Sequence, residues 1–357
     1  MIRRIYTTII SFTFAVLTLT SCSDWLELYP ADEIKEEYLF SSGDGYRTAL
    51  NGIYRKMATF NLYGSNLTWG IIDAWGQAYY LDEAPDSGGG KAMDKISDFN
   101  FKNAELVPTT DAMWNAAWNV VANCNNLAPK KIIDVNKSKR YFRASTSRYD
   151  IEEYGNMKMY NDIIFALYSP TELVDWDHEI NHAYDGSDGE KYLCIHKNIA
   201  QEIYGDELST DWRAKYQLES KYYGYYYRPL KYYAQPSKAQ YAEVNNQTIP
   251  MIRMSEVYYI AAEAIFDSNP SEAIEYLKEV KKGRGVSFNK TGIGKEEFMN
   301  ILVNDARREF LGEGQILYLY KRLNIPIKTG DPYYGEDVLP TDEYAVLPMP
   351  DSESSIN

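Results

Sequence analysis

The chain has 357 residues, of which 45% are hydrophobic and 15% aromatic, including 33 tyrosines, and its 37 basic and 51 acidic side chains give a formal net charge of −14. This length and composition can bury a core in one large domain or two modest ones, and the aromatic content excludes a disordered acidic chain. An acidic chain without basic blocks is also a poor candidate for binding nucleic acid or an anionic lipid surface, so we expect no nucleic-acid partner.

Residues 1–21 are predicted to be a lipoprotein signal peptide. Two arginines precede an uncharged, mostly apolar stretch over 9–20, which is shorter than the ~20 apolar residues that a membrane-spanning helix needs. The string Leu19-Thr20-Ser21-Cys22 resembles a bacterial lipobox, in which cleavage leaves Cys22 at the new amino terminus for acylation. Because two or more acyl chains anchor a protein stably, we expect a lipid anchor at Cys22 and a mature body over 22–357. The alternative is an ordinary signal peptide with an incidental cysteine.

The first part of the body is predicted to contain two amphipathic helices. Apolar residues recur at the spacing of one helical face over about 46–57, and Ser41, Ser42 or Asp44 can cap the start of this helix. The same rhythm predicts a second helix over about 111–127. Its apolar stripe includes three residues that we expect to be buried, Trp114, Trp118 and Cys124.

The segments between the predicted helices have weaker periodicity. Residues 61–101 are rich in Trp, Tyr, Asp and Gly and are predicted to form a long, partly ordered loop region. Farther along, 162–169 has a strand-like apolar core. A tyrosine-rich run at 222–233 is interrupted by Pro229, so we expect it to form a loop or an edge strand.

From Met251 onward, apolar residues again recur at the spacing of a helical face. One apolar stripe runs to Ile265, Asn269-Pro270 breaks it, and a second stripe ends before Gly283. Two amphipathic helices joined by a short turn match a tetratricopeptide-like unit, whose repeat is ~34 residues. A last long, charged helix is predicted over 295–323, and an irregular proline-containing tail follows it.

A resemblance to a known protein family rests on several strings that are spread from end to end of the chain. They are CSDWLELYP at 22–30, FSSGDGYRTALNGIY at 40–54, WNAAWNVVANCNNL at 114–127, IPMIRMSEVYYIAAEA at 249–264, RREFLGEG at 307–314, YKRL at 320–323 and LPMP at 347–350. With these strings the chain resembles the SusD/RagB family of surface glycan-binding lipoproteins of Bacteroidetes-type bacteria, as a short, divergent member. It departs from the family's closing signature at Ile316 and Leu319, where an Arg and an Asp are usual.

The resemblance implies a fold and a role. The implied fold is an all-α, tetratricopeptide-type helical scaffold with long irregular loops and minor β structure, in a single domain over 22–357. The implied role is that of a lid on a SusC-like TonB-dependent transporter, held at the cell surface on the outer membrane by the lipid anchor. Such a protein binds an oligosaccharide or polysaccharide, or in some members a peptide, and passes it inward without chemistry and without a cofactor.

Recognition of a carbohydrate needs flat aromatic faces for the sugar rings and polar groups for the hydroxyls. The 61–101 region and the tyrosine run supply both kinds of side chain. From them we predict a ligand-binding site that consists of Trp69, Trp75, Tyr79, Tyr80, Asp82, Tyr225 and Tyr227. The alternative for Trp75 and Tyr79, which are four residues apart, is one face of a short helix that packs inward.

The strongest competing signal is the string His178-Glu179-Ile180-Asn181-His182. On a helix, H-E-x-x-H places two imidazoles on one face for zinc, with the Glu as general base. Here the string follows a strand-like segment, and Gly186 ends any helix within a turn. We therefore expect no catalytic residue and no metal site. A zinc-dependent surface hydrolase remains the alternative function, together with a protein-binding scaffold or adhesin that has no small ligand.

Two further features favour structural interpretations. Cys124 and Cys194 lack the spacing of a metal site, and their spacing leaves open whether they form a disulfide. Asp185, Asp188 and Glu190 lack the spacing of a calcium-binding loop, so we expect a solvated acidic turn there.

Overall fold

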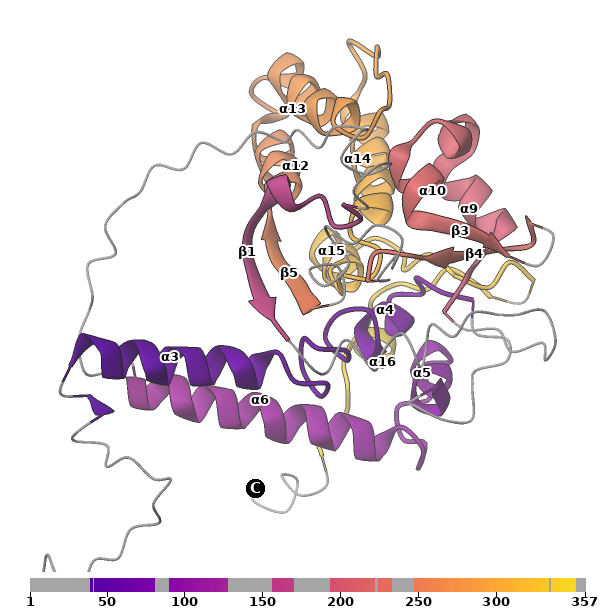
Figure 1. The fold of residues 1–357 in the computed structure, drawn as a ribbon. Coiled ribbons are helices and arrows are strands. Elements are labelled where there is room, and N and C mark those ends of the chain that lie inside the picture. The colour runs from indigo at the N-terminus through magenta and orange to yellow at the C-terminus, as the bar shows by residue number, and fades with distance from the viewer. Residues whose placement is uncertain are drawn as a thin grey trace, which may run out of the picture. The chain divides into compact units, whose positions relative to one another are not determined.

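A computed structural model describes residues 39–40, 42–80, 90–127, 156–169, 193–221, 224–232, 247–333 and 335–350. Figure 1 shows the fold. The chain divides into two compact units between Ala49 and Leu50, within helix α3 (Gly43–Met57). Several predicted features lie outside the described residues: the signal peptide, Cys22, Asp82, the string at 178–182 and the acidic turn at 185–190.

Helix α3 confirms the helix predicted over 46–57. In the first unit, the N–H of Gly45 donates a hydrogen bond to Ser42 Oγ at 3.1 Å, so Ser42 caps the helix. The rings of Phe40 and Tyr46 lie 5.0 Å apart between centroids beside this cap. On the part of α3 that belongs to the second unit, Ile53 is buried.

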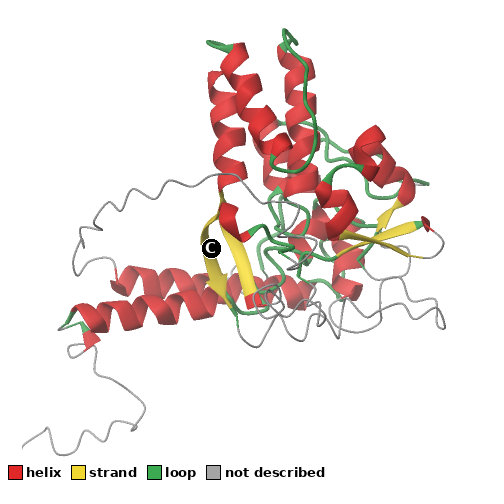
Figure 2. Cartoon of the chain, turned by 45° about the horizontal axis from the view of Figure 1, so that its top comes forward, coloured by secondary structure: helices red, strands yellow, loops and turns green. Residues whose placement is uncertain are grey.

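The rest of the second unit is mainly helical, with small sheets, as predicted (Figure 2). Its helices are α4 (Ile71–Trp75), α5 (Gly90–Ser97), α6 (Val107–Leu127), α9 (Lys197–Tyr204), α10 (Trp212–Gln217), α12 (Met254–Ile265), α13 (Pro270–Lys282), α14 (Lys295–Glu309), α15 (Ile316–Leu323) and α16 (Asp342–Ala345), with 3₁₀ turns at Tyr160–Asp162 and Gly205–Ser209. Its strands are β1 (Ile163–Tyr168), β2 (Ile195–His196), β3 (Leu218–Lys221), β4 (Tyr226–Pro229) and β5 (Thr248–Arg253). None of the helices in the described part of the chain combines the length and the hydrophobicity that crossing a bilayer requires.

The strands form two antiparallel sheets. Strand β1 confirms the strand-like segment at 162–169 and pairs with β5. The second sheet has the order β2-β4-β3. The tyrosine run therefore supplies a central strand, and the prediction of a loop or an edge strand is wrong for Tyr226–Pro229. Pro229 is tolerated because it is the last residue of the strand, where a missing N–H interrupts little of the ladder.

The predicted helix pair is confirmed as α12 and α13. Both helices contact α14, and Figure 1 shows the three together. Pro270 is the first residue of α13, and the N–H of Glu272 donates to Asn269 Oδ1 at 3.3 Å to cap it. Helix α12 begins at Met254 rather than Met251, because the residues before it pair with β1 as strand β5. Gly283 ends α13 as its C-cap.

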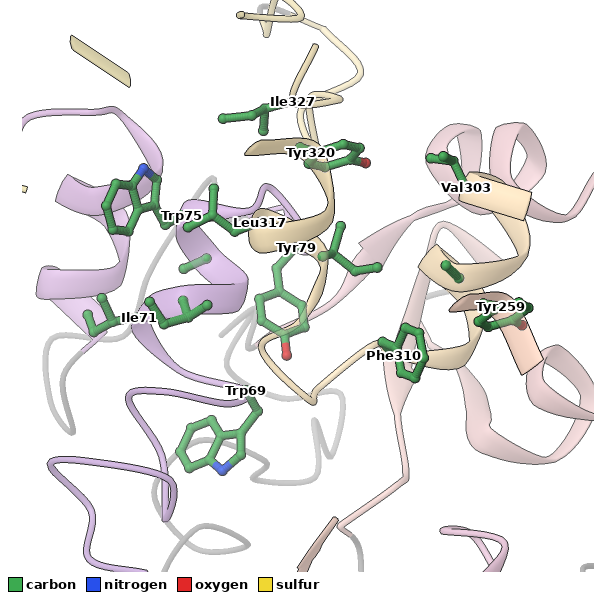
Figure 3. Close-up of a cluster of buried hydrophobic side chains, with 14 of the residues drawn as sticks. Trp69, Ile71, Trp75, Tyr79, Tyr259, Val303, Phe310, Leu317, Tyr320 and Ile327 are labelled. Atoms are coloured by element: carbon green, nitrogen blue, oxygen red, sulfur yellow. The ribbon is translucent and has the colours of Figure 1, made fainter. Parts of the chain in front are cut away.

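Many side chains within 61–80 and 90–101 belong to the main hydrophobic core, and the prediction of a loop is wrong where α4 and α5 form. All five residues of α4 are buried, which is the pattern of a helix surrounded by protein on every side. Trp69 and Trp75 lie in the same cluster as Leu317 and Tyr320 of α15 (Figure 3). The core thus joins an early segment of the chain to a late one.

The last predicted helix, over 295–323, is two helices, α14 and α15. The turn between them holds Gly312 and Gly314 in the left-handed region, at φ 78° and φ 68°. Both glycine N–H groups donate to the buried Asp73 carboxylate, at 2.6 Å and 2.9 Å. This contact from α4 stabilises the break between the helices.

Helix α6 corrects two predictions of burial. Trp118 is 55% exposed and Cys124 is exposed, whereas Met113 and Ala116 on the same helix are buried. The apolar rhythm located the helix correctly, but a period does not say which of two adjacent faces a neighbour covers. Trp114 is half-buried and contacts Trp118, with 5.8 Å between ring centroids. Cys194 is buried, and it forms no disulfide with the exposed Cys124.

A buried charge network connects α14 to four other segments. Its side chains are at most 1% exposed and comprise Asp162, Asp211, Arg213, Arg253, Arg284, Asp305 and Glu309. Arg213 Nη2 lies 2.7 Å from Asp305 Oδ1, and Arg284 Nη2 lies 2.6 Å from Glu309 Oε1. Burial alone would raise the pKa of Glu309, but the charges of Arg284 and Arg253 outweigh it and hold the pKa well below its usual value.

Candidate functional site

Four aromatic rings from separate parts of the chain meet beside the β2-β4-β3 sheet, and we name them the tyrosine cluster: Tyr80, His196, Tyr226 and Tyr333. Two backbone contacts bring three of them together. The N–H of Tyr80 donates to the carbonyl oxygen of Cys194 at 2.8 Å, and His196 pairs with Tyr226 in the β2–β4 ladder. The rings of Tyr80 and Tyr226 are nearly parallel, at 10°, with centroids 6.1 Å apart.

His196 is the buried centre of the tyrosine cluster. Its ring centroid lies 5.6 Å from those of Tyr80 and Tyr226 and 5.1 Å from that of Tyr333. Its Nδ1 accepts a hydrogen bond from the N–H of Asn198 as the cap of α9, which places the proton of a neutral ring on Nε2. Nε2 lies 3.0 Å from the Tyr333 hydroxyl oxygen and can therefore donate to it. The histidine thus fixes the position of an exposed tyrosine.

A short turn presents Tyr333. Ile327 and Val338 form an antiparallel bridge at its base, and the N–H of Tyr333 donates to Asp331 Oδ1 at 2.7 Å. At Gly330 the turn lies so close to the chain before Tyr80 that a Cβ there would be 2.3 Å from the Tyr79 carbonyl oxygen. Backbone contacts on both sides therefore hold the turn against the cluster.

The exposed rings at this site are Tyr333 and Tyr225, at 57% and 43%. The Lys197 ammonium lies 3.6 Å from the centroid of the Tyr225 ring and covers one of its faces. Tyr227 is half-buried in β4, opposite Ile195 of β2. The site therefore combines flat, partly exposed aromatic surface with a cationic donor, a combination that suits hydroxyl-bearing rings.

The predicted site residues are divided between this surface and the core. Trp69, Trp75 and Tyr79 are 1%, 5% and 4% exposed, and Figure 3 shows them among core side chains. Trp75 Nε1 donates to the Tyr344 carbonyl oxygen at 2.7 Å. The inward-packing alternative describes Trp75 and Tyr79, and the surface available to a ligand does not include these three rings. Tyr80, Tyr225 and Tyr227 lie at or beside the tyrosine cluster.

Three residues of the tyrosine cluster, His196, Tyr226 and Tyr333, are not among the predicted site residues, although Tyr226 belongs to the tyrosine run. His196 lies outside both aromatic-rich regions of the sequence, and the Asp-Pro-Tyr-Tyr-Gly string at 331–335 is predicted only to belong to the irregular tail. A turn of this composition that exposes a tyrosine was the available signal. Within the described ranges, no group of three or more His, Cys, Asp or Glu side chains is arranged to hold a metal ion.

Comparisons with known proteins point to one family. The model of the SusD family (SusD_RagB) matches residues 128–344. A SusD superfamily protein from Bacteroides thetaiotaomicron has a similar structure, with a TM-score of 0.60 and 17% identity over 88% of this chain and 98% of that one. A putative sugar binding protein from Bacteroides vulgatus gives a TM-score of 0.52 and 15% identity, over 88% of this chain and 96% of that one. No curated protein matches the chain.

Proposed function

The chain belongs to the SusD family, and from this premise we propose that it binds an oligosaccharide or polysaccharide at the tyrosine cluster and delivers it to a SusC-like TonB-dependent transporter without chemical change. The observation that carries the proposal is the pair of exposed rings, Tyr333 and Tyr225, beside a buried His196 that fixes one of them. A ring held in place before binding loses little conformational entropy when a ligand stacks on it.

The net charge of the chain and the description of one structural relative support a neutral sugar as the ligand. The formal net charge of −14 suits uncharged ligands better than polyanions. A structural relative from Bacteroides vulgatus bears the description of a putative sugar binding protein. In this proposal Tyr333 provides the main stacking surface, because the Lys197 ammonium already covers one face of Tyr225.

The direct test is a titration of the chain from residue 22 against neutral polysaccharides, oligosaccharides and peptides. For a glycan that binds, we expect Tyr333→Ala and Tyr225→Ala each to lower the affinity roughly 5- to 30-fold, equivalent to about 1–2 kcal/mol. Tyr168→Ala is the matched control, since Tyr168 is 61% exposed on strand β1 of the other sheet. Full affinity in both Tyr333→Ala and Tyr225→Ala would refute the proposed site, and binding of peptides alone would refute a glycan as the ligand.

We propose that the protein acts at the outer membrane, anchored through Cys22. Replacing this cysteine with alanine is expected to release the chain from the membrane fraction, because the acyl chains would be lost. Copurification of the anchored chain with a barrel transporter from outer membranes tests the delivery step. A chain that stays membrane-bound without Cys22, or that never copurifies with a transporter, would contradict this part of the proposal.

A further inference from the structure

A cavity of about 510 Å³ lies between α12, α14, α15 and the segment at 63–68. Its volume is within the range of small-molecule sites, ~300–1,000 Å³. The residues that line it come from segments other than those of the tyrosine cluster. The glycan site proposed above therefore does not account for it.

The interior of the cavity is apolar and aromatic. Phe310, Leu302 and Tyr259 are buried in its wall, and the Tyr259 and Phe310 rings, visible in Figure 3, lie 5.8 Å apart between centroids. Tyr318 and Ile260 also line it, and they are 53% and 57% exposed. The cavity thus has an apolar inner wall and a partly exposed rim.

Carboxylates provide the polar part of the lining. Glu263 is neutralised by Arg322, whose guanidinium donates to both of its oxygens at 2.5 Å and 2.7 Å. Glu313 is 4% exposed; its Oε1 accepts from Lys231 and Arg253, while its Oε2 is buried without a hydrogen-bond partner in the described structure. An orphaned buried carboxylate oxygen is costly unless a donor meets it.

Glu256 is the third carboxylate in the lining of the cavity. It is half-buried and lines the cavity, and within the described ranges it forms no ion pair with a basic side chain. Burial, and then the nearby charge of Glu313, raises the pKa of Glu256, although the charge of Arg253 and a hydrogen bond from its backbone N–H oppose the rise. The cavity therefore presents two acidic side chains that a positively charged group would complement.

From this geometry we propose that the cavity binds a primary alkylammonium group, with the ammonium at Glu256 and Glu313 and the alkyl stem against the apolar wall. Aromatic rings favour the same ligand, because Tyr63 and Tyr318 line the cavity and cations are attracted to ring faces. Such a group can belong to a free amine or to a lysine side chain of a peptide or protein.

The test compares n-hexylamine with 1-hexanol on the chain from residue 22, by calorimetry at neutral pH. We expect the ammonium to bind at least tenfold more tightly than the neutral alcohol, because only it forms charge-assisted hydrogen bonds. Glu256→Gln should lower the affinity for hexylamine tenfold or more. Glu256 lies outside the buried charge network, so this variant is expected to fold.

Two controls separate the cavity from general effects of charge. Glu296→Gln removes the same charge from an exposed position on α14 and should change the affinity less than twofold. Tyr333→Ala should also leave amine binding unchanged, so a failure of the glycan site is distinguishable from a failure of this one. A short peptide with a single lysine then distinguishes a peptide source from a free amine. Equal binding of hexanol and hexylamine, no binding of hexylamine, or full affinity in Glu256→Gln would overturn the proposal.

Discussion

Asp73 shows how one buried side chain holds together distant parts of the chain. Its carboxylate lies in α4 and accepts the N–H groups of Gly312 and Gly314 from the turn between α14 and α15. Burial raises the pKa of Asp73 to about 7, although the hydrogen bond from Gly312 and the charge of Lys231 oppose the rise. The contact is therefore made by a carboxyl group that is costly to ionise.

This raised pKa predicts a pH dependence of stability. An unfolded Asp titrates near pH 3.9, so between about pH 4 and pH 7 the folded protein binds more protons at this site than the unfolded chain does. Its contribution to the free energy of unfolding is complete below pH 4 and is lost as the pH rises through about 7. We expect a loss from this residue of about 2–3 kcal/mol between pH 5 and pH 8.

Urea denaturation at both pH values tests this prediction with Asp73→Asn. The variant cannot titrate at this position, so it should lose less stability than the wild type over the same interval. The comparison removes the contribution of every other titrating group. Identical losses in the two proteins would show that Asp73 keeps an ordinary pKa in the folded state.

At the scale of elements, the turn between α14 and α15 depends on backbone geometry that a β-carbon would disturb. Gly314 has φ 68°, and a Cβ there would lie 2.3 Å from the carbonyl oxygen of Leu67. Gly292 has a similar φ of 65°, but a Cβ there would meet nothing within 4 Å. The two glycines share a conformation and differ in their surroundings.

Alanine at each glycine should therefore separate backbone strain from collision. We expect Gly292→Ala to cost about 1–2 kcal/mol, the usual strain of a left-handed alanine. Gly314→Ala should cost about 2 kcal/mol more, since the backbone near Leu67 must also shift. Denaturation midpoints with unchanged m-values give the comparison. Equal costs would mean that the turn moves freely away from Leu67.

The sequence predicted correctly those helix boundaries that neighbouring residues determine. Asn269-Pro270 fixed the start of α13 because both the cap and the proline act within the first turn. The break after Glu309 was missed because the acceptor that stabilises it, Asp73, is more than 200 residues away along the chain. The residues of the proposed ligand surface divide in the same way. Tyr225 and Tyr227 belong to a tyrosine run that is visible in the sequence, whereas tertiary contacts bring His196 and Tyr333 together.

At the scale of the whole molecule, the buried charge network is the main polar connection between segments. Glu309 on α14 accepts from Arg213 and Arg284, and it also pairs with Arg253 at 2.8 Å. These partners come from α10, from the residues after α13 and from the end of β5. Removing one member of such a network leaves its partners as uncompensated buried charges.

We therefore expect Glu309→Gln to lower the free energy of unfolding by roughly 3–5 kcal/mol. Glu297→Gln is the matched control on the same helix, because Glu297 pairs with Lys290 at 2.6 Å at an exposed position. That variant should change stability by less than about 1 kcal/mol. Chemical denaturation of both proteins measures the difference. Comparable effects of the two substitutions would argue that the arginines reorganise or reach water when Glu309 is lost.

The position of α14 after β5 in the chain has a consequence for folding during synthesis. Within the described residues, Arg253 forms its ion pairs with Glu309 and Glu313, which the ribosome adds after it. A nascent chain that ends before α14 carries this guanidinium without either carboxylate, and a bare charge resists burial. We expect the central core to close only after α14 has been made.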